Sequence, residues 1–192
     1  MKVFNKYVTV AALAVLPVIA SAFPIALAGT EGLSVIVTGT DDIIATYQGN
    51  SASYSNDLYL SLTASSVPAG TFIFNNHTSP VGATMDLGSF AVGTELIFRL
   101  NVTNTGDNFY TGAASRNADG KAHARVQSNW MPNESLVSFE DLFGTPEGIN
   151  GYNDLSFSFT NTTSAPAVPE PASIALFSVG LLGLGFLKRK MK

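Results

Sequence analysis

The amino-acid sequence predicts an all-β domain with a β-sandwich or jelly-roll-like architecture over residues 29–164, flanked by a targeting segment at each end. Apolar and polar residues alternate in several short segments, and clusters of Asn, Gly, Ser and Thr separate those segments. Between residues 29 and 165 we find no apolar stripe of the kind that an amphipathic helix needs. None of the 192 residues is cysteine, so packing or metal ions, rather than disulfides, must stabilise the domain.

The alternation is clearest in four segments: LSVIVT (33–38), DLYLSLT (57–63), ELIFRLNVT (95–103) and DLSFSFT (154–160). In the last of these, apolar residues at every second position face one way and serines face the other. Such a pattern is typical of a strand with one side in the core and the other in solvent. Short strands of this kind, joined by polar turns, favour two packed sheets.

The N-terminal segment has the features of a secretory signal peptide. Lys2 and Lys6 precede an apolar run over residues 8–20, and small residues follow. Two cleavage sites fit the A-x-A pattern, one after Ala22 and one after Ala28. The second is favoured because Phe23-Pro24 stiffens the chain just after the first, so residues 1–28 are expected to be the signal peptide of an exported protein.

A second hydrophobic segment closes the chain. Residues 165–171 form a proline-rich linker, and residues 172–187 contain no charge. The basic residues Lys188, Arg189 and Lys190 follow at once, as in a stop-transfer signal whose tail stays in the cytoplasm. Residues 172–192 are therefore predicted to be a transmembrane helix with a basic tail. Its span of roughly 24 Å is short for a ~30 Å hydrocarbon core, which suits a temporary hold in the membrane.

The C-terminal pattern resembles a known sorting signal. Val168, Pro169, Glu170 and Pro171 precede the apolar span and the basic cluster, and this order is similar to that of the PEP-CTERM family. The resemblance implies processing near Pro-Glu-Pro by an exosortase-like membrane transpeptidase, in a Gram-negative bacterium that makes extracellular polysaccharide. The protein would be anchored transiently in the inner membrane and then reach the cell surface or the extracellular space.

Charge is distributed unevenly along the chain. All fourteen acidic residues lie between residues 29 and 171, together with only four basic residues, so this part carries a net charge of −10. An acidic surface without a basic patch argues against nucleic acid and anionic membranes as partners of the processed protein. It leaves carboxylates available for divalent cations.

Acidic residues concentrate around the last predicted turn, where we expect a weak Ca²⁺ site. Glu140 and Asp141 end one apolar segment, and Asn153 and Asp154 begin the last predicted strand, so a hairpin-like path brings both pairs together. Asp119, in an earlier loop, is a further candidate oxygen ligand, and hard oxygen ligands are those that Ca²⁺ prefers. The alternative is that these are solvated turn residues which protect a sheet edge.

Residues 85–160 resemble the domain of unknown function 4114. The resemblance rests on residues 139–142 (FEDL) and 152–157 (YNDLSF), with upstream matches at 93–98, 117–120 and 123–124. It implies a bacterial extracellular β-domain with an acid-rich loop in which calcium binding is plausible. Ile149 and Gly151 stand where the family pattern has two carboxylates, which implies a weak or lost site.

The sequence contains none of the common catalytic motifs, and we expect no enzymatic activity. The leading expectation is a structural or adhesive protein of the extracellular polysaccharide matrix. The alternative is a carbohydrate-binding module in which Trp130, the only tryptophan, stacks on a sugar ring.

Overall fold

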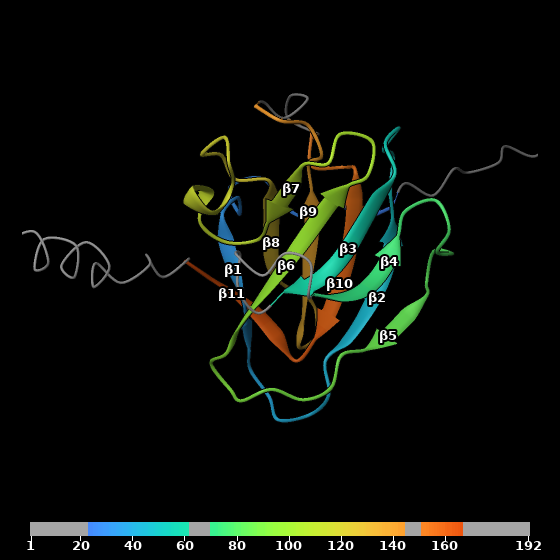
Figure 1. Ribbon diagram of the computed structural model, residues 1–192. Helices are drawn as coiled ribbons and strands as arrows, with labels where there is room; N and C mark the ends of the chain where they lie inside the picture. Colours follow the sequence, from blue (N-terminus) through green and yellow to red (C-terminus); the bar gives the residue numbers. More distant parts are fainter. Residues whose placement is uncertain (1–22, 62–69, 145–150, 167–192) are drawn as a thin grey trace, which may run out of the picture.

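The computed structural model describes residues 23–61, 70–144 and 151–166, which form two antiparallel sheets packed face to face (Figure 1). The first sheet contains, in spatial order, β11 (Thr162–Pro166), β1 (Leu33–Val37), β6 (Glu95–Val102), β3 (Asn56–Ser61) and β4 (Thr71–Asn75), and β7 (Asn108–Tyr110) also pairs with β6. The second sheet contains β5 (Thr84–Asp86), β2 (Ile44–Gly49), β10 (Leu155–Thr160), β9 (Glu134–Phe139) and β8 (Ala124–Met131). A short 3₁₀ helix, η1 (Ala114–Arg116), lies between β7 and β8.

The core lies between the sheets and is rich in aromatic side chains. Phe98 of β6 stacks on Phe159 of β10, with ring centroids 4.0 Å apart, and Phe74 of β4 stacks on Phe157 of β10 at 6.0 Å. Phe157 and Phe159 occupy alternate positions of β10, so the period-two pattern places both of them on the inner face. The prediction of an all-β protein with two sheets is confirmed; the jelly-roll alternative stays a prediction.

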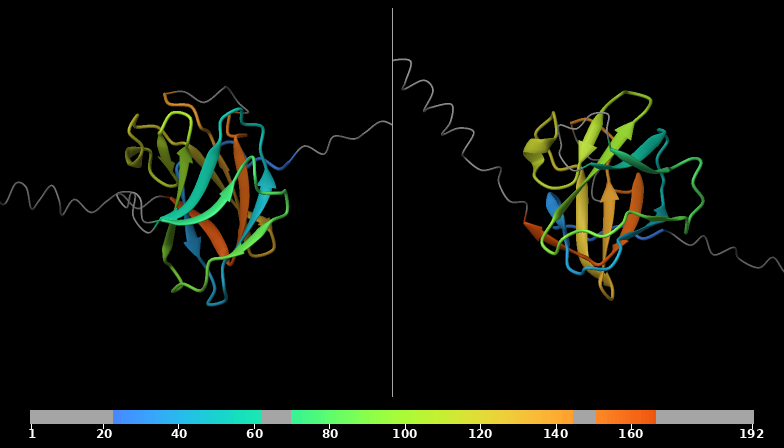
Figure 2. Two further views of the ribbon diagram at one scale, coloured as in Figure 1. Left: turned by 45° about the vertical axis from the view of Figure 1, so that its right-hand side comes forward. Right: turned by 60° about the horizontal axis from the view of Figure 1, so that its bottom comes forward.

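The outer face of the second sheet differs from expectation. The alternating serines of β10 were expected to face solvent, yet Ser156 and Ser158 are 0% and 2% exposed. A segment of the chain before β1, residues 23–28, crosses this face, where the Ala26 N–H donates to Ser138, the hydrogen-bond partner of Ser156; in Figure 2 it is the blue N-terminal stretch. Ser158 accepts a hydrogen bond from Nε2 of Gln48 over 3.0 Å. The pattern within β10 carries no sign of this cover, because it comes from more than a hundred residues away.

The predicted targeting segments meet the described part of the chain at two points. Residues 23–28, assigned above to the signal peptide, are part of the folded domain. The first two residues of the predicted linker, Ala165 and Pro166, end β11, where they pair with Ser34 and Leu33 of β1. The described residues contain no helix long and apolar enough to cross a membrane. The sorting helix predicted over 172–192, the sorting motif and residues 1–22 of the signal peptide lie outside the described residues.

Candidate metal centre

Three carboxylates meet where the hairpin-like pair β9 and β10 opens. Phe139 at the end of β9 pairs with Leu155 at the start of β10, so the residues just beyond each strand are neighbours. Ligand oxygens of Glu140, Asp141 and Asp154 all lie within 4.8 Å of one another. Their residues are 1%, 5% and 8% exposed, so the group is buried rather than solvated. We call these three residues the acidic centre.

Hydrogen bonds hold the acidic centre in place. The backbone N–H of Asp141 donates to Oδ2 of Asp154 over 2.7 Å, and the N–H of Leu142 donates to Oε1 of Glu140 over 3.0 Å. From the other sheet, Nδ2 of Asn56 at the start of β3 donates to Oδ2 of Asp141 over 2.7 Å. The centre thus joins the two sheets as well as the two strands.

Crowding of the carboxylates changes the protonation of Asp154. Burial is the largest cause and raises the pKa of Asp154, and the nearby charges of Asp141 and Glu140 raise it further. The hydrogen bond from the Asp141 N–H acts in the opposite direction, but the pKa still reaches about 8. A hydrogen bond between the Asp154 and Glu140 side chains accompanies this rise. At neutral pH Asp154 therefore stays mostly protonated unless a cation lies among the three carboxylates.

Asn56, which contacts the acidic centre, carries one polar atom whose hydrogen bonding is not satisfied. Its Oδ1 is buried and has no hydrogen-bond partner, although Nδ2 is satisfied by Asp141. Leaving such a group unsatisfied costs about 1–3 kcal/mol. In the structure the donor Nδ2 faces Asp141, so Asn56 would present an oxygen to the acidic centre only after a rotation of its amide.

The donor set fits a hard cation. The three carboxylates offer oxygen ligands of the kind that Ca²⁺ takes, and Ca²⁺ tolerates the irregular arrangements that loops provide. Water or hydroxyl oxygens would complete a shell of six to eight oxygens.

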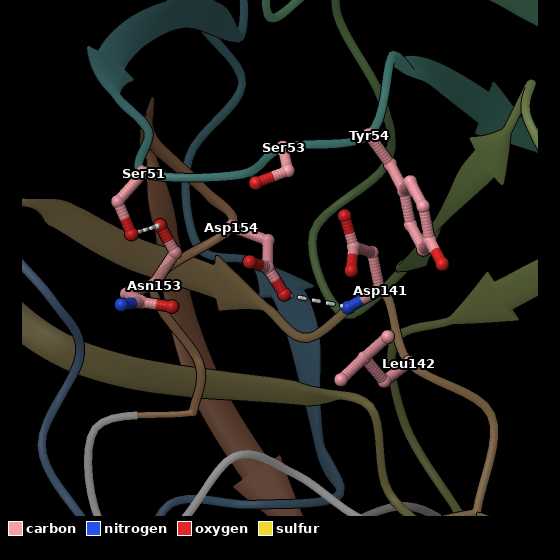
Figure 3. A pocket seen from close by; sticks show the side chains of 7 residues that line it. All are labelled: Ser51, Ser53, Tyr54, Asp141, Leu142, Asn153 and Asp154. Carbon is pink, nitrogen blue, oxygen red and sulfur yellow. Dashed lines mark hydrogen bonds between the residues drawn. The ribbon is translucent and has the colours of Figure 1, made fainter.

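A polar cavity of about 230 Å³ opens onto the acidic centre (Figure 3). Asp141 and Asp154 line one side, and the β2–β3 loop supplies Ser51, Ser53 and Tyr54 on the other. The loop is tied to the site because the Ser51 N–H donates to the Asn153 carbonyl oxygen over 2.9 Å. An ion at Asp141 and Asp154 would therefore face this cavity.

Two other candidate ligands from the sequence have different roles. Asn153 lines the cavity and holds Ser51 through its carbonyl oxygen. Asp119 does not join the acidic centre: its Oδ2 accepts from Nε2 of His123 over 2.8 Å and from the Gly144 N–H over 2.9 Å. Nδ1 of His123 lies 3.1 Å from the Glu140 carbonyl oxygen, so Asp119 and His123 position the backbone that carries Glu140.

Sequence reasoning missed Asn56 and the Ser51–Tyr54 loop. Asn56 lies 85 residues before Asp141, and nothing local in the sequence links the two. The polar stretch GNSASYSND (49–57) was the only available signal, and it looks like any loop between strands. Trp130 lies elsewhere: it is near the β8–β9 turn, whereas the acidic centre adjoins the Ala124–Phe139 end of those strands.

Comparison with known proteins identifies the C-terminal segment. Residues 167–190 match the family model of the PEP-CTERM protein-sorting motif. Neither the curated proteins nor the solved structures gave a match to the chain. The comparisons do not show the resemblance of residues 85–160 to the domain of unknown function 4114, which stays a prediction.

The matched motif and the two-sheet fold define a class: an exported all-β protein that carries a sorting signal read by an exosortase, a membrane enzyme. The signal implies that the chain is held at the membrane during processing, before it reaches the cell surface or the extracellular space.

Proposed function

We propose that this protein is a structural component of the extracellular polysaccharide matrix, with a β-sandwich stabilised by Ca²⁺ at the acidic centre. The sorting motif accounts for its delivery to the outside of the cell. The observation that carries the calcium proposal is that the buried carboxylates of Glu140, Asp141 and Asp154 lie within 4.8 Å of one another. The neighbouring Asn56 has an Oδ1 without a hydrogen-bond partner. We assign no catalytic activity to the domain.

In this role calcium links the two sheets. Asn56 belongs to the first sheet, and the acidic centre follows the strands of the second. An ion held by both would resist their separation, and extracellular calcium would become part of the stability of the fold.

Thermal unfolding of the processed domain with millimolar Ca²⁺, and then with chelator, tests the calcium site. At a Ca²⁺ concentration one hundred times Kd, binding adds about 2.7 kcal/mol to the free energy of unfolding. For a domain of this size that is a rise in Tm of several degrees. Asp154→Asn removes the rise, while Asp41→Asn, at an exposed carboxylate, keeps it. Identical wild-type curves with and without Ca²⁺ would rule the site out.

A second candidate function is carbohydrate binding, and the cavity over the acidic centre favours it. The aromatic ring of Tyr54 and the hydroxyls of Ser51 and Ser53 flank the two aspartates (Figure 3), and aromatic rings with hydroxyl groups suit a sugar. The volume is below the ~300–1,000 Å³ of pockets for drug-sized ligands, so it suits a single sugar ring.

Titration of the host polysaccharide into the Ca²⁺-loaded domain separates the two functions. Binding that Tyr54→Ala weakens and Trp130→Ala leaves unchanged would favour a carbohydrate-binding module that uses this cavity. No binding, together with a normal calcium response, would leave the structural role alone.

A further inference from the structure

The stretch between the predicted signal peptide and β1 is built into the fold. The backbone N–H of Ala26 donates to Oγ of Ser138 on β9 over 2.9 Å, and that hydroxyl also bonds Ser156 of β10 over 2.8 Å. The N–H of Leu27 donates to Oε1 of Gln127 on β8 over 3.1 Å. Residues 23–28, which we call the strap, thus cross the outer face of the second sheet (Figure 2).

The chain after the strap extends the second sheet at the edge formed by β8. The N–H of Gly32 donates to the Ala124 carbonyl oxygen, and the N–H of Val126 donates to the Thr30 carbonyl oxygen, both over 3.0 Å. Glu31 pairs with Arg125 of the same strand over 2.7 Å. An edge strand with unpaired backbone groups invites aggregation, and residues 30–32 cover part of this edge.

The second sheet packs closely against the strap. At Gly49, the last residue of β2, a Cβ atom would lie 2.6 Å from Cβ of Phe23. The φ angle of Gly49 is +133°, which few other residues adopt. Ala26 is 2% exposed, and Ser138 and Ser156 beneath the strap are fully buried.

We infer that signal peptidase cuts after Ala22, so that the mature protein begins at Phe23 and keeps the strap. Water is added across the Ala22–Phe23 peptide bond, which leaves a carboxylate on Ala22 and an α-amine on Phe23. Cleavage after Ala28 would remove the strap, and with it the Phe23 side chain over Gly49 and the cover of the buried Ser138 and Ser156 hydroxyls.

The two A-x-A sites cannot be separated by sequence pattern alone, because both satisfy it. Packing separates them: cleavage after Ala22 keeps Phe23 and Ala26, which contact Gly49 and Ser138, and cleavage after Ala28 removes both. The stiffness of Phe23-Pro24, which favoured the second site at the level of sequence, is a property of the strap.

The test is the N-terminus of the exported protein. The full chain is expressed in a Gram-negative host, recovered from the periplasm or membrane, and analysed by intact mass and N-terminal sequencing. A chain that begins at Phe23 is expected. A chain that begins at Gly29, or that keeps Met1, overturns the inference.

Two matched variants sharpen the test. Ala28→Tyr blocks the second site and, because Ala28 is exposed, leaves the packing intact; the start at Phe23 and the Tm should not change. Ala22→Tyr blocks the first site and should abolish the product that starts at Phe23. If instead Ala28→Tyr prevents processing and Ala22→Tyr does not, the cut lies after Ala28 and the inference is wrong.

Discussion

Carboxylates that are wholly or partly buried occur in two contrasting settings in this molecule. Oε1 and Oε2 of Glu95 face the guanidinium group of Arg116 at 2.6 and 2.9 Å, and Glu31 faces Arg125 at 2.7 Å. In the acidic centre, by contrast, Asp154 faces two other carboxylates. An arginine of the same chain compensates the negative charge of Glu95 and of Glu31. In the acidic centre, a bound proton or cation has to do so.

The pKa values follow this contrast. Burial on its own raises the pKa of Glu95, but hydrogen bonds from Arg116 and Ser34 outweigh it and hold the pKa below its usual value. Burial likewise raises the pKa of Asp154, and there the neighbouring carboxylates add to the effect instead of opposing it. A group of the first kind stabilises the fold when ionised, and one of the second kind destabilises it unless a ligand is bound. The direction of the pKa shift therefore distinguishes Glu95, whose charge stabilises the fold, from Asp154, whose charge needs a bound cation.

The largest expected effect comes from Asp154→Asn in the presence of chelator. The amide keeps the shape of the side chain, can still accept from the Asp141 N–H, and needs no proton, whereas Asp154 must take one up when the chain folds at pH 7 without a cation. We expect the free energy of unfolding at pH 7 to rise by about 2–4 kcal/mol. Urea denaturation measures it, with Asp41→Asn as the control. A loss of stability would show that the acidic centre is not strained without a cation.

The pH dependence without Ca²⁺ should carry the same signature. The folded-state pKa of Asp154, about 8, lies above the unfolded value of about 4. Between pH 4 and pH 8 the unfolded chain can ionise Asp154 while the folded chain keeps it protonated, so a rise in pH over this range stabilises the unfolded chain relative to the folded one. Lowering the pH from 8 to 5 should therefore raise the free energy of unfolding, by up to about 4 kcal/mol. Asp154→Asn should lack this rise, and a flat wild-type profile over this range would contradict the assignment.

Glu95→Gln should act in the opposite direction. The glutamate makes a two-pronged contact with Arg116, whose side chain is 7% exposed, and the amide cannot compensate that charge. We expect a loss of about 2–3 kcal/mol at pH 7. Because the pKa of Glu95 is lowered in the fold, its contribution is present above the unfolded value and is lost as the pH falls through the folded value. Equal free energies of unfolding for wild type and variant at pH 7 would show that the Glu95 charge does not stabilise the fold, contrary to the comparison with Asp154.

The sequence predicted some of these features and not others, for a physical reason. The alternation around Phe157 and Phe159 is local, so it predicted β10 and its inward face; the proximity of Glu140 to Asp154 followed from a short turn. Contacts across the sheets leave no local pattern. Asn56 reaches Asp141 over 85 residues, and Ala26 covers Ser138 over 112, so neither the complete site nor the burial of the serines was predictable.

Asp119 shows a second limit. An acidic residue in a polar loop has the composition of a metal ligand, but a histidine four residues later occupies it. Burial by itself raises the pKa of Asp119, and the hydrogen bonds from His123 and two backbone N–H groups reverse the shift. Its role became visible only when the strand after it placed His123 between the loop and Glu140.

The smallest expected effect is that of Glu31→Gln, which tests whether the ion pair with Arg125 holds residues 29–32, just after the strap, on the sheet. Glu31 accepts from the backbone N–H of Gly29 over 2.8 Å as well as from Arg125, but its side chain is 30% exposed, so solvent screens the pair. Arg125 also lies over the ring of Tyr152, with its guanidinium carbon 4.3 Å from the ring centroid, so the variant does not leave it without a favourable contact. We expect the free energy of unfolding in urea denaturation to fall by about 1 kcal/mol, and by less at high salt.

Hydrogen exchange at Gly32 and Val126, whose N–H groups join residues 30–32 to β8, should become faster in the variant. Unchanged exchange would mean that packing of the strap, rather than this ion pair, fixes residues 29–32 on the sheet.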